Sequence, residues 1–531
     1  MLNIDRVLVR NYRCLREADL TLNPDLNIIV GDNECGKSTL LEAIHLALSG
    51  QLNGRAVQTE LHPHIFNSSV VSEYVAAIRA KKAVLPPSIV IELYLADNPA
   101  LAKLKGNNNS LGKDVPGIRL TIEFNVDYSD EYKAYVATPD EIRTLPIEYY
   151  VVRWRGFDDN DITARSIPVK PAFIDASTIK NNLAANRYVV DILRDSLTAT
   201  QKVDMALSYR LMKDAFMDNA KVKKVNAALA SKKGDISDKT LSVSLDTSSR
   251  STWESGVMPH LDDIPMALVG KGEQNSVKIK LAMESKSDSN IVLIEEPENH
   301  LSFSNLNTLI AHIANHRGNR QLLITTHSSF VLNKLDLGAV VLFKRGQSFR
   351  LTDLDKDTRD YFMRLPGHDT LRLILAKRSI LVEGPSDELI VQAAFFHKFG
   401  KLPLDAGVDV ISVNSLAFKR FLDIAAGLEK TVDVVTDNDG DVAALRAKYA
   451  DYLGYGCINI RYDADETYPT LEPQMLKANG KAVVEKVLGS NFPDEASLLK
   501  YMKANKADVA LKFFTTEEPW VPPDYIADAI A

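Results

Sequence analysis

The chain has 531 residues, of which 45% are hydrophobic and 25% charged, and its formal net charge is −7. This length exceeds one hydrophobic core and predicts about two to four globular domains. The acidic balance argues against a protein that coats DNA, but a DNA enzyme stays open because local charge decides phosphate contacts. No apolar run approaches the ~20 residues that span a bilayer, and the first residues lack the apolar stretch of a secretory signal, so we expect no membrane partner.

The cysteine pattern bears on the compartment. Cys14, Cys35 and Cys457 lie far apart in the chain and form no CxxC pair. Disulfide frames and zinc–cysteine sites need paired or closely spaced cysteines. We therefore expect a reducing, cytoplasmic environment, with no disulfide frame and no zinc site.

The first fifty residues predict a nucleotide-binding loop. Residues 7–10 and 26–30 are rich in β-forming side chains, and residues 38–48 carry apolar side chains at helical spacing. Between strand and helix stands Gly31-Asp32-Asn33-Glu34-Cys35-Gly36-Lys37-Ser38, the GxxxxGKS pattern in the context that a P-loop requires. Lys37 would reach the β- and γ-phosphates, and the Ser38 hydroxyl would ligate Mg²⁺. We expect ATP as a cofactor, held by Gly31, Asn33, Gly36, Lys37, Ser38 and Thr39.

The next segments predict strands and then a helical insertion. Residues 89–95 and 118–124 have strand patterns, separated by turn-forming residues at 106–110. Residues 176–231 hold few glycines or prolines and place apolar side chains, such as Leu207 and Leu211, at helical spacing. From Lys202 to Lys233 this insertion carries eight Lys or Arg and three Asp. It could be a solvated helical face, a dimer interface formed by the apolar stripe, or a phosphate-binding surface.

An α/β pattern returns between residues 257 and 345. It predicts a helix from about residue 276, a strand at 291–294, a helix from about residue 304 and a strand at 321–325. The first strand ends in Glu295 and Glu296, which suits a Walker B element: Glu295 would face Mg²⁺ and Glu296 would polarise the attacking water. The alternative is a buried strand whose terminal acids only cap it. His327 follows the second strand and could sense the γ-phosphate.

Residues 356–375, with Pro366-Gly367, predict a hinge, and a second α/β unit runs from residue 379 to the end. One strand is followed by Glu383, with Asp387 in the first turn of a helix, and another ends in Asp437 and Asp439. Neighbouring strand ends of a parallel sheet can converge their acids on one point. Oxygen ligands without Cys or His select Mg²⁺ or Mn²⁺, and carboxylates this close repel one another unless cations separate them.

Two further acids near this strand are left out of the predicted site. Asp433 lies inside the strand and is expected to face away from the cluster. Asp441 could be a bystander or an auxiliary ligand.

Several motifs of the first part resemble the ATPase heads of SMC and RecF-like proteins. Gly270-Lys271-Gly272-Glu273-Gln274 resembles the ABC signature, and the likeness extends to Asn11-Tyr12-Arg13, residues 26–44 and Glu296-Pro297-Glu298-Asn299-His300-Leu301. In that family the signature contacts ATP held by a second protomer, which implies a nucleotide role for Gly272 and at least two copies of the chain. One departure is Glu295, which stands where the family has aspartate.

The later acids resemble a Toprim domain over roughly residues 378–515, and the whole layout is similar to OLD-family (overcoming lysogenisation defect) nucleases. The resemblance extends to Glu472 and Lys506. It implies that up to two metals are held by Glu383, Asp387, Asp437, Asp439 and Glu472. Glu383 could instead act as general base, and Lys506 would offset charge on the pentacovalent state.

The resemblance implies an α/β fold with four parts. These are an ABC-type ATPase head (residues 1–175 and 236–365), a helical dimerisation insertion (176–235) and a Rossmann-like Toprim nuclease domain (372–531). The expected activity is an ATP-controlled, Mg²⁺- or Mn²⁺-dependent DNA endonuclease of prokaryotic anti-phage defence, acting as a homodimer or higher homo-oligomer. A helicase, a reverse transcriptase with its non-coding RNA, or another defence protein could be its partner.

Two other classes of protein stay open. One is a repair ATPase whose acidic domain only binds DNA or protein. The other is a topoisomerase or primase, although no gate domain and no zinc-binding cysteines are evident.

Overall fold

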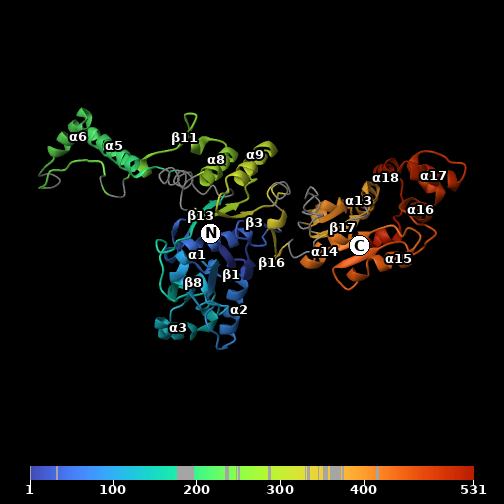
Figure 1. Ribbon diagram of the computed structural model, residues 1–531, viewed down its shortest axis with the longest axis horizontal. Coiled ribbons are helices and arrows are strands. Elements are labelled where there is room, and N and C mark those ends of the chain that lie inside the picture. The colour runs from blue at the N-terminus through green and yellow to red at the C-terminus, as the bar shows by residue number, and fades with distance from the viewer. Residues whose placement is uncertain are drawn as a thin grey trace. The chain divides into compact units, whose positions relative to one another are not determined.

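The computed structural model describes residues 2–31, 34–175, 190, 197–233, 238–246, 248, 252–284, 289–328, 331, 335, 337–344, 346–350, 357–358, 372–373, 376–413 and 418–531. Asn33 of the predicted P-loop and the Pro366-Gly367 hinge lie outside these residues. The chain divides into two compact units, one of residues 1–12, 21–27 and 40–326 and one of residues 13–20, 28–39 and 327–531. Figure 1 labels elements of both units.

A first sheet of six strands is antiparallel at each of the pairings described. Its order is β2-β1-β6-β8-β7, with β9 also paired to β8. The predicted strand at 89–95 is confirmed as β6, and the one at 118–124 begins three residues earlier, in β8. All seven residues of β6 are buried. The bounds are β1 (Ile4–Tyr12), β2 (Leu15–Thr21), β6 (Ile89–Leu95), β7 (Lys105–Gly106), β8 (Val115–Phe124) and β9 (Tyr150–Gly156).

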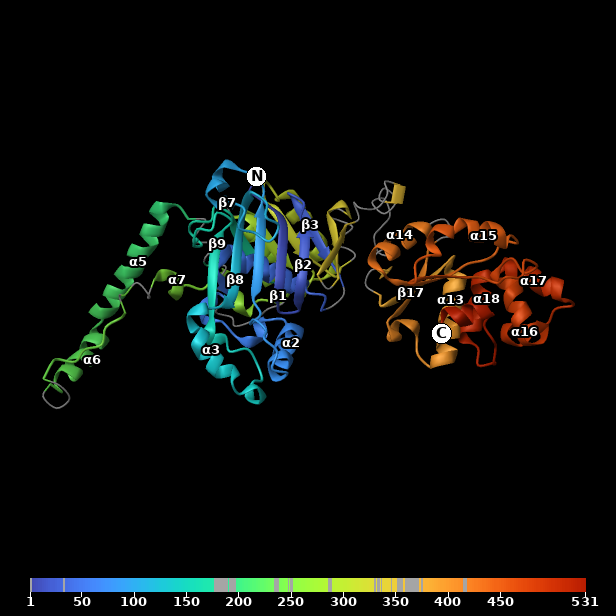
Figure 2. The same ribbon diagram turned by 90° about the horizontal axis from the view of Figure 1, so that it is seen from below.

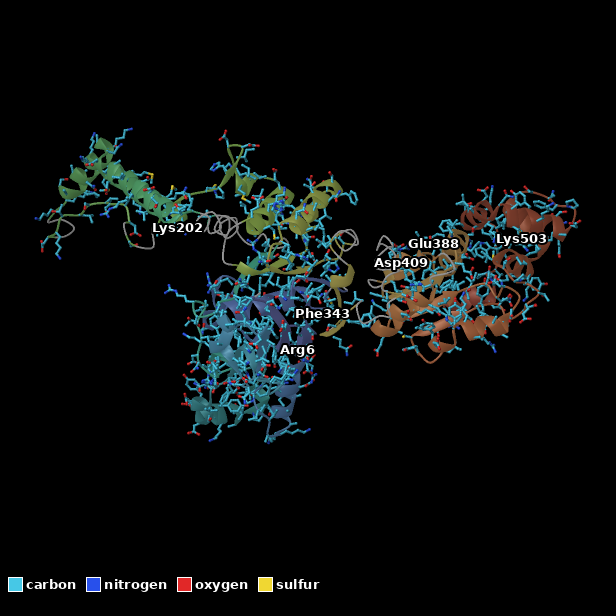
Figure 3. The ribbon with its side chains drawn as sticks, viewed as in Figure 1. Arg6, Lys202, Phe343, Glu388, Asp409 and Lys503 are labelled. Atoms are coloured by element: carbon cyan, nitrogen blue, oxygen red, sulfur yellow. The ribbon has the colours of Figure 1, made fainter. Side chains whose placement is uncertain are left out.

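A second sheet of six strands has the order β10-β13-β14-β3-β15-β16. The β10–β13, β13–β14 and β3–β15 pairs are parallel, and β16 is antiparallel to β15. Strands covered on both faces are buried along their whole length and rich in apolar residues, as in β14 and β3. The bounds are β10 (Lys170–Asp175), β13 (Ser289–Glu295), β14 (Gln321–Thr325), β3 (Leu26–Val30), β15 (Val340–Lys344) and β16 (Gln347–Arg350). Phe343 of β15, labelled in Figure 3, is 1% exposed.

Three helices belong to the predicted nucleotide-binding segments: α1 (Lys37–Ser49), α8 (Lys271–Glu284) and α9 (Phe303–Asn315). The prediction that α8 begins near residue 276 was wrong by five residues. Its glycine-rich start is already helical, because the Gln274 N–H donates to the Gly270 carbonyl and the Gln274 side chain donates to the Val269 carbonyl at 2.8 Å. Ser302 caps α9, which buries an i, i+3, i+4, i+7 stripe of Leu306, Leu309, Ile310 and Ile313.

Residues 199–230 of the insertion are helical, as predicted, in α5 (Ala199–Asp218) and α6 (Ala220–Ala230), which we call the arm (Figure 2). Residues 176–189 and 191–196 fall outside the description. Asn219 ends α5 and caps α6, and Asn226 exchanges two hydrogen bonds with the backbone of Val243 on the returning segment. Side chains project outward along the arm, where Figure 3 labels Lys202. Its exposed apolar residues include Val203, Leu207, Leu211, Met212 and Phe216.

The C-terminal sheet has four parallel strands in the order β18-β17-β19-β20. Their bounds are β17 (Arg378–Val382), β18 (Val408–Ser412), β19 (Thr431–Val435) and β20 (Ile458–Arg461). Among the described residues, the helices that accompany them are α13 (Pro385–Phe399), α14 (Phe418–Leu428), α15 (Val442–Lys448), α16 (Leu471–Leu488), α17 (Glu495–Ala504), α18 (Lys506–Thr515) and α19 (Asp524–Ala529). A buried core of these strands and helices includes Ile380, Phe395, Met502, Phe513 and Trp520. The expected α/β fold class, with parallel sheets, is confirmed.

The described chain also has smaller elements besides its short 3-10 helices. They are α2 (Ser68–Arg79), α3 (Ser129–Val136), α7 (Trp253–Gly256) and the two-residue pairs β4 (Gln51–Leu52) with β5 (Arg55–Ala56) and β11 (His260–Leu261) with β12 (Ile264–Pro265). No helix among the described residues combines the length and the hydropathy of a membrane span.

Candidate metal centre and nucleotide-binding segments

The order of the C-terminal sheet places two acids side by side. The chain runs from β17 outward to β18 and then returns to the other side of β17 as β19. This is a topological switch point, where ligands bind beyond the carboxyl ends of the strands. Glu383 directly follows β17, and Asp437 stands two residues after the end of β19. The Glu383 Oε1 atom accepts hydrogen bonds from the Asp437 N–H at 3.0 Å and from the Thr436 hydroxyl at 2.6 Å.

Asp387 reaches the same edge from α13. Gly384 caps this helix and Pro385 is its first residue, so Asp387 stands in the first turn. The Asp387 Oδ2 atom accepts the Gly384 N–H at 3.0 Å, which holds the carboxylate over the turn that leaves β17.

Asp439 lies on an exposed turn after β19 and adopts a positive φ of 50°. Asn438, 1% exposed, holds this turn from inside. Its amide group donates to the carbonyls of Asp463 and Asp465 at 2.8 and 3.0 Å, while its Oδ1 atom accepts the Gly440 N–H at 2.8 Å. The turn that carries Asp439 is therefore cross-braced to the segment after β20.

Glu472 and Lys506 approach the edge from two helices. Glu472, at the start of α16, is 4% exposed, and the Thr470 hydroxyl donates to its Oε2 atom at 3.1 Å. Lys506, the first residue of α18, lies 2.9 Å from the Glu472 Oε1 atom. Burial opposes the charged ammonium, but the bond to Glu472 and the charges of Asp437 and Asp387 leave the pKa of Lys506 raised.

The electrostatics join these acids into one cluster. Burial, followed by the charges of Glu383, Asp387, Glu472 and Asp439, raises the pKa of Asp437 to about 8. Burial and Glu383, with a smaller effect of Glu472, raise the pKa of Asp387 to about 6. Each carboxylate is therefore repelled by the others across a poorly solvated space. A divalent cation bound among them would remove this repulsion.

The donor set fits Mg²⁺ or Mn²⁺, because it consists of carboxylate oxygens. The cluster is nevertheless open. Among the described residues, a group of three or more His, Cys, Asp or Glu side chains with all ligand atoms within 4.8 Å of one another is found at Glu284, His312 and His316. The carboxylates of the acidic centre do not meet that criterion. A wide acidic centre can hold ions through some protein oxygens and some waters, as Mg²⁺ usually does.

Asp433 and Asp441, the two acids left out of the predicted site, form other contacts. Asp433, 1% exposed, forms ion pairs with Arg378 at 2.8 Å and with Arg461 at 3.2 Å, so it faces away from the cluster, as expected. Asp441 caps α15 by accepting the Ala444 N–H at 2.8 Å.

Two residues that support the acidic centre were not predicted from the sequence. Thr436 is 3% exposed and orients Glu383, and Asn438 braces the turn. Both are uncharged, and polar residues after a strand usually indicate no more than a turn. The available signal was their position, because Thr436 lies between the strand and Asp437, and Asn438 lies between Asp437 and Asp439.

The predicted P-loop joins β3 to α1. Gly36 has a φ of 102°, and a Cβ on Gly31 would lie 2.1 Å from the Phe343 carbonyl oxygen, so both positions need glycine. Lys37 is 5% exposed, and its Nζ donates to the Gly31 carbonyl at 2.9 Å. Ser38 and Thr39 stand in the first turn of α1, where the Thr39 hydroxyl lies 3.2 Å from the Cys14 sulfur. This turn suits phosphate oxygens at a helix N-terminus.

The predicted Walker B acids end β13. Glu295 is 6% exposed and pairs in register with Asp175 of β10 and Thr325 of β14. Glu296 has a φ of 43°, and its Oε2 atom accepts from the Asn299 amide at 2.8 Å.

The predicted signature glycine packs against the segment that follows these acids. A Cβ on Gly272 would lie 2.2 Å from the His300 carbonyl oxygen. His327 follows β14 by two residues, one beyond Thr326, and is half-buried.

Three family models match the chain. A model described as an AAA domain matches residues 6–131, and a second AAA domain model, whose description also names the AbiEii toxin and type IV TA systems, matches residues 217–333. A model described as the TOPRIM domain of overcoming lysogenization defect protein-like sequences matches residues 374–439. That last range includes Glu383, Asp387, Asp437 and Asp439 and ends before Glu472.

Similar curated proteins match short segments. The chain is 46% identical to the DNA replication and repair protein RecF of Magnetococcus marinus over 55 residues, which are 10% of this chain and 14% of that protein. It is 27% identical to the Structural maintenance of chromosomes protein 6 of Saccharomyces cerevisiae over 135 residues, 24% of this chain and 12% of that protein. The chain thus spans a small part of the length of these relatives.

Similar solved structures include RecF with ATP, with a TM-score of 0.33, 11% identity and coverage of 66% of this chain and 99% of that chain. Another is the C-terminal region of the Xanthomonas campestris OLD protein, with a TM-score of 0.22, 21% identity and coverage of 29% and 92%. On the sequence matches, the chain combines two segments that match AAA domain models with a later segment that matches an OLD-like TOPRIM domain.

Proposed function

We propose that this protein is an ATP-controlled DNA endonuclease that uses Mg²⁺ or Mn²⁺ at the acidic centre of its C-terminal sheet. The observation that carries the proposal is the repulsion within this centre, where burial and four neighbouring carboxylates raise the pKa of Asp437 to about 8. Hard divalent cations relieve such repulsion and promote attack on phosphodiesters. The OLD-like TOPRIM match over residues 374–439 supports the same assignment.

In this proposal Glu383, Asp387, Asp437, Asp439 and Glu472 hold up to two ions. When bound, the ions supply Lewis acidity at the scissile phosphate. Glu383, already oriented by Thr436 and by the Asp437 N–H, either ligates an ion or accepts the proton of the attacking water. Lys506 carries positive charge beside Glu472 and would stabilise the phosphate as its negative charge grows.

The nucleotide part of the proposal uses the segments after β3, β13 and β14. Gly31, Gly36, Lys37, Ser38 and Thr39, with Asn33, would hold the phosphates and Mg²⁺ of ATP. Glu295 would face the Mg²⁺, Glu296 would polarise water, and His327 would sense the γ-phosphate. Support comes from the strand order, in which β13, β14 and β3 are neighbours in one sheet.

A homodimer or higher homo-oligomer follows from the proposed role of Gly272 toward ATP of a second copy. The arm is the proposed dimerisation surface, because Leu207 is 53% and Leu211 67% exposed on α5. Solvated helices seldom expose so many large apolar side chains together. Leu211→Asp should lower the oligomeric mass measured by light scattering, and an unchanged mass would remove the arm from the interface.

The proposed substrate is DNA, and the proposed setting is cytoplasmic defence against phage, with a helicase, a reverse transcriptase or another defence protein as the further partner. The role in defence is tested by plating phage on cells that express the wild type or Glu383→Ala. Equal plaque counts on both would reject that role and leave the nuclease proposal to be judged by its own assay.

A plasmid assay tests the nuclease. Supercoiled plasmid is incubated with protein and Mg²⁺ or Mn²⁺, with and without ATP. We expect nicking or linearisation by the wild type, loss of cleavage in Glu383→Ala and Asp437→Ala, and full cleavage by Asp451→Asn, an exposed acid of the same unit. Cleavage by the first two variants at the wild-type rate would refute the acidic centre as the site.

The second candidate is a repair ATPase whose TOPRIM domain only binds DNA or protein, favoured by the RecF and SMC6 matches. It predicts ATP hydrolysis that is lost in Lys37→Ala and no cleavage by the wild type. It also predicts DNA binding that Asp437→Ala leaves unchanged, whereas the endonuclease requires cleavage that depends on both divalent metal and Asp437.

A further inference from the structure

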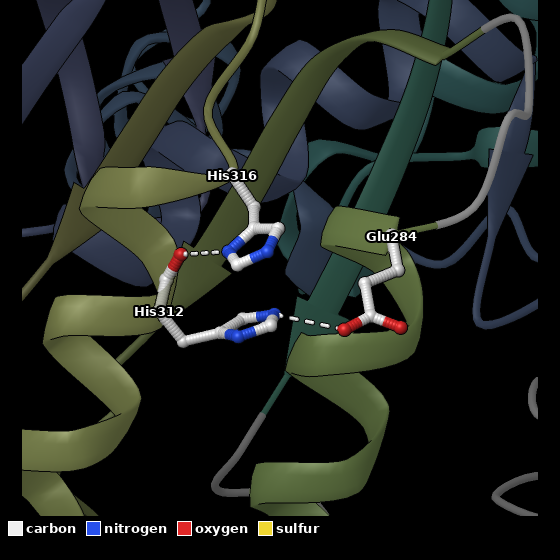
Figure 4. A group of neighbouring side chains, drawn as sticks. All are labelled: Glu284, His312 and His316. Carbon is white, nitrogen blue, oxygen red and sulfur yellow. Dashed lines mark hydrogen bonds and ion pairs between the residues drawn. The ribbon is translucent and has the colours of Figure 1, made fainter.

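Three side chains converge at the C-terminal ends of two helices of the first unit (Figure 4). His312 lies in the last turn of α9, His316 follows the end of that helix, and Glu284 is the last residue of α8. All three offer a ligand atom, and these atoms lie within 4.8 Å of one another. The two imidazole rings stack with centroids 3.9 Å apart, and the His312 Nε2 atom lies 3.7 Å from the Glu284 Oε1 atom.

The spacing suits one ion. His316 stands four residues after His312, at the C-cap of α9, so the two rings lie side by side at the end of the helix, and a turn of one ring would aim both nitrogens at one point. Two ligands of a tetrahedral Zn²⁺, each about 2.1 Å from the ion, are separated by about 3.4 Å. The 3.7 Å between His312 and Glu284 is close to that separation.

The hydrogen bonds leave the ligand atoms in the state that a metal needs. The His316 Nδ1 atom lies 2.9 Å from the His312 carbonyl oxygen, which can only accept, so Nδ1 is the donor and Nε2 is the ring nitrogen left to face an ion. A ring N–H bonded to a backbone carbonyl is the usual second contact of a metal-binding histidine. The His312 Nε2 atom is buried and has no hydrogen-bond partner within the described part of the chain.

An ordinary ion pair between His312 and Glu284 is the competing explanation. The distance of 3.7 Å between the His312 Nε2 atom and the Glu284 Oε1 atom is longer than that of a hydrogen bond, so the two groups are near each other without being directly bonded. The pair also does not include His316, whose ring stacks on that of His312.

We propose that Glu284, His312 and His316 form a site for a transition-metal ion of the Zn²⁺ type, with water completing the coordination. Two imidazoles and one carboxylate favour Zn²⁺ over Mg²⁺, because nitrogen donors select borderline cations. The expectation of no zinc site rested on the cysteines, which this site does not use. The carbonyl-rich ends of two helices also favour a cation there.

The ion would join the far end of α8, which begins at the predicted signature glycine, to the far end of α9, which follows the Glu295-Glu296 pair. Its bonds to both helices would resist their separation. The site is independent of the proposed nuclease and ATPase activities, and it survives if either of them fails.

Direct binding of Zn²⁺ tests the proposal. The full chain is titrated calorimetrically with Zn²⁺ in millimolar Mg²⁺, in an Asp437→Ala background that weakens the acidic centre. We expect one Zn²⁺ per chain, at least 10-fold weaker binding in Glu284→Gln and loss of the site in His312→Ala/His316→Ala. His62→Ala/His64→Ala is the matched control, because these two exposed histidines also stack, with centroids 4.9 Å apart. It should bind Zn²⁺ as the parent does.

Two further readouts separate loss of ligands from loss of fold. Co²⁺ should produce visible absorption typical of nitrogen ligation in the parent and in the His62/His64 control, but not in the His312/His316 variant. Zn²⁺ should raise the Tm of the parent and leave the Tm of the folded His312/His316 variant unchanged. Equal Zn²⁺ stoichiometry and affinity in the parent and in His312→Ala/His316→Ala would overturn the proposal.

Discussion

Replacing Asp437 by asparagine should stabilise the metal-free protein at neutral and alkaline pH. The asparagine would keep the size of the side chain and remove its charge from a buried cluster of carboxylates. In the wild type the folded protein must either keep a proton on Asp437 or accept the repulsion of Glu383, Asp387, Glu472 and Asp439. Both cost free energy relative to the unfolded chain, where the carboxylate ionises in water.

The magnitude follows from the pKa of Asp437, which is raised from 3.8 to about 8 in the folded protein. Between pH 4 and pH 8 the folded state holds a proton that the unfolded state has released. The free energy of unfolding therefore falls by about 1.4 kcal/mol per pH unit across that window, to a total of at most about 6 kcal/mol. Below pH 4 the penalty is absent, and above pH 8 it is constant.

Urea unfolding in EDTA at pH 4, 6 and 8 measures the effect. We expect equal stability of wild type and Asp437→Asn at pH 4 and a difference that widens to several kcal/mol at pH 8, in favour of the variant. Added Mg²⁺ should narrow the gap, because it stabilises the wild type more. Asp451→Asn, at an exposed position, should show no such trend. A difference between wild type and Asp437→Asn that does not change with pH would refute the reasoning.

Three other substitutions probe separate parts of the molecule. Asp433→Asn should lower the free energy of unfolding, measured by thermal denaturation, by about 3–5 kcal/mol, because Arg378 and Arg461 lose their buried carboxylate partner. The plasmid cleavage rate per folded molecule should stay unchanged. Lys506→Met should lower the plasmid cleavage rate on the order of 100-fold. It should change the free energy of unfolding by about 1 kcal/mol or less, because the Lys506 side chain is 53% exposed. Lys506→Arg should recover part of the cleavage rate. Gly272→Ala should impair ATP turnover, because its Cβ would lie 2.2 Å from the His300 carbonyl, whereas Gly270→Ala, which meets no atom within 4 Å, should hydrolyse ATP normally.

Local patterns predicted the strands and their terminal residues well. The strand at 321–325 is confirmed residue for residue, and the strand at 26–30 equally so; both are short, rich in Ile, Leu or Val, and buried along their whole length. Patterns of mixed polarity failed. β9, with the sequence YVVRWRG and five half-buried residues, is not predicted, since its contacts lie on a neighbouring strand far away in sequence.

The amino-acid sequence by itself determined the chemistry that each segment can offer: a phosphate-binding loop at Gly31 to Ser38 and acids at the ends of apolar strands. These are local properties of residue type and spacing. The tertiary structure alone decided which groups meet. It brings Lys506 to 2.9 Å from Glu472, turns Asp433 toward two arginines, and gathers two histidines and a glutamate from the ends of α8 and α9. Such encounters depend on how whole elements pack, and no local pattern of apolar and polar residues encodes that packing.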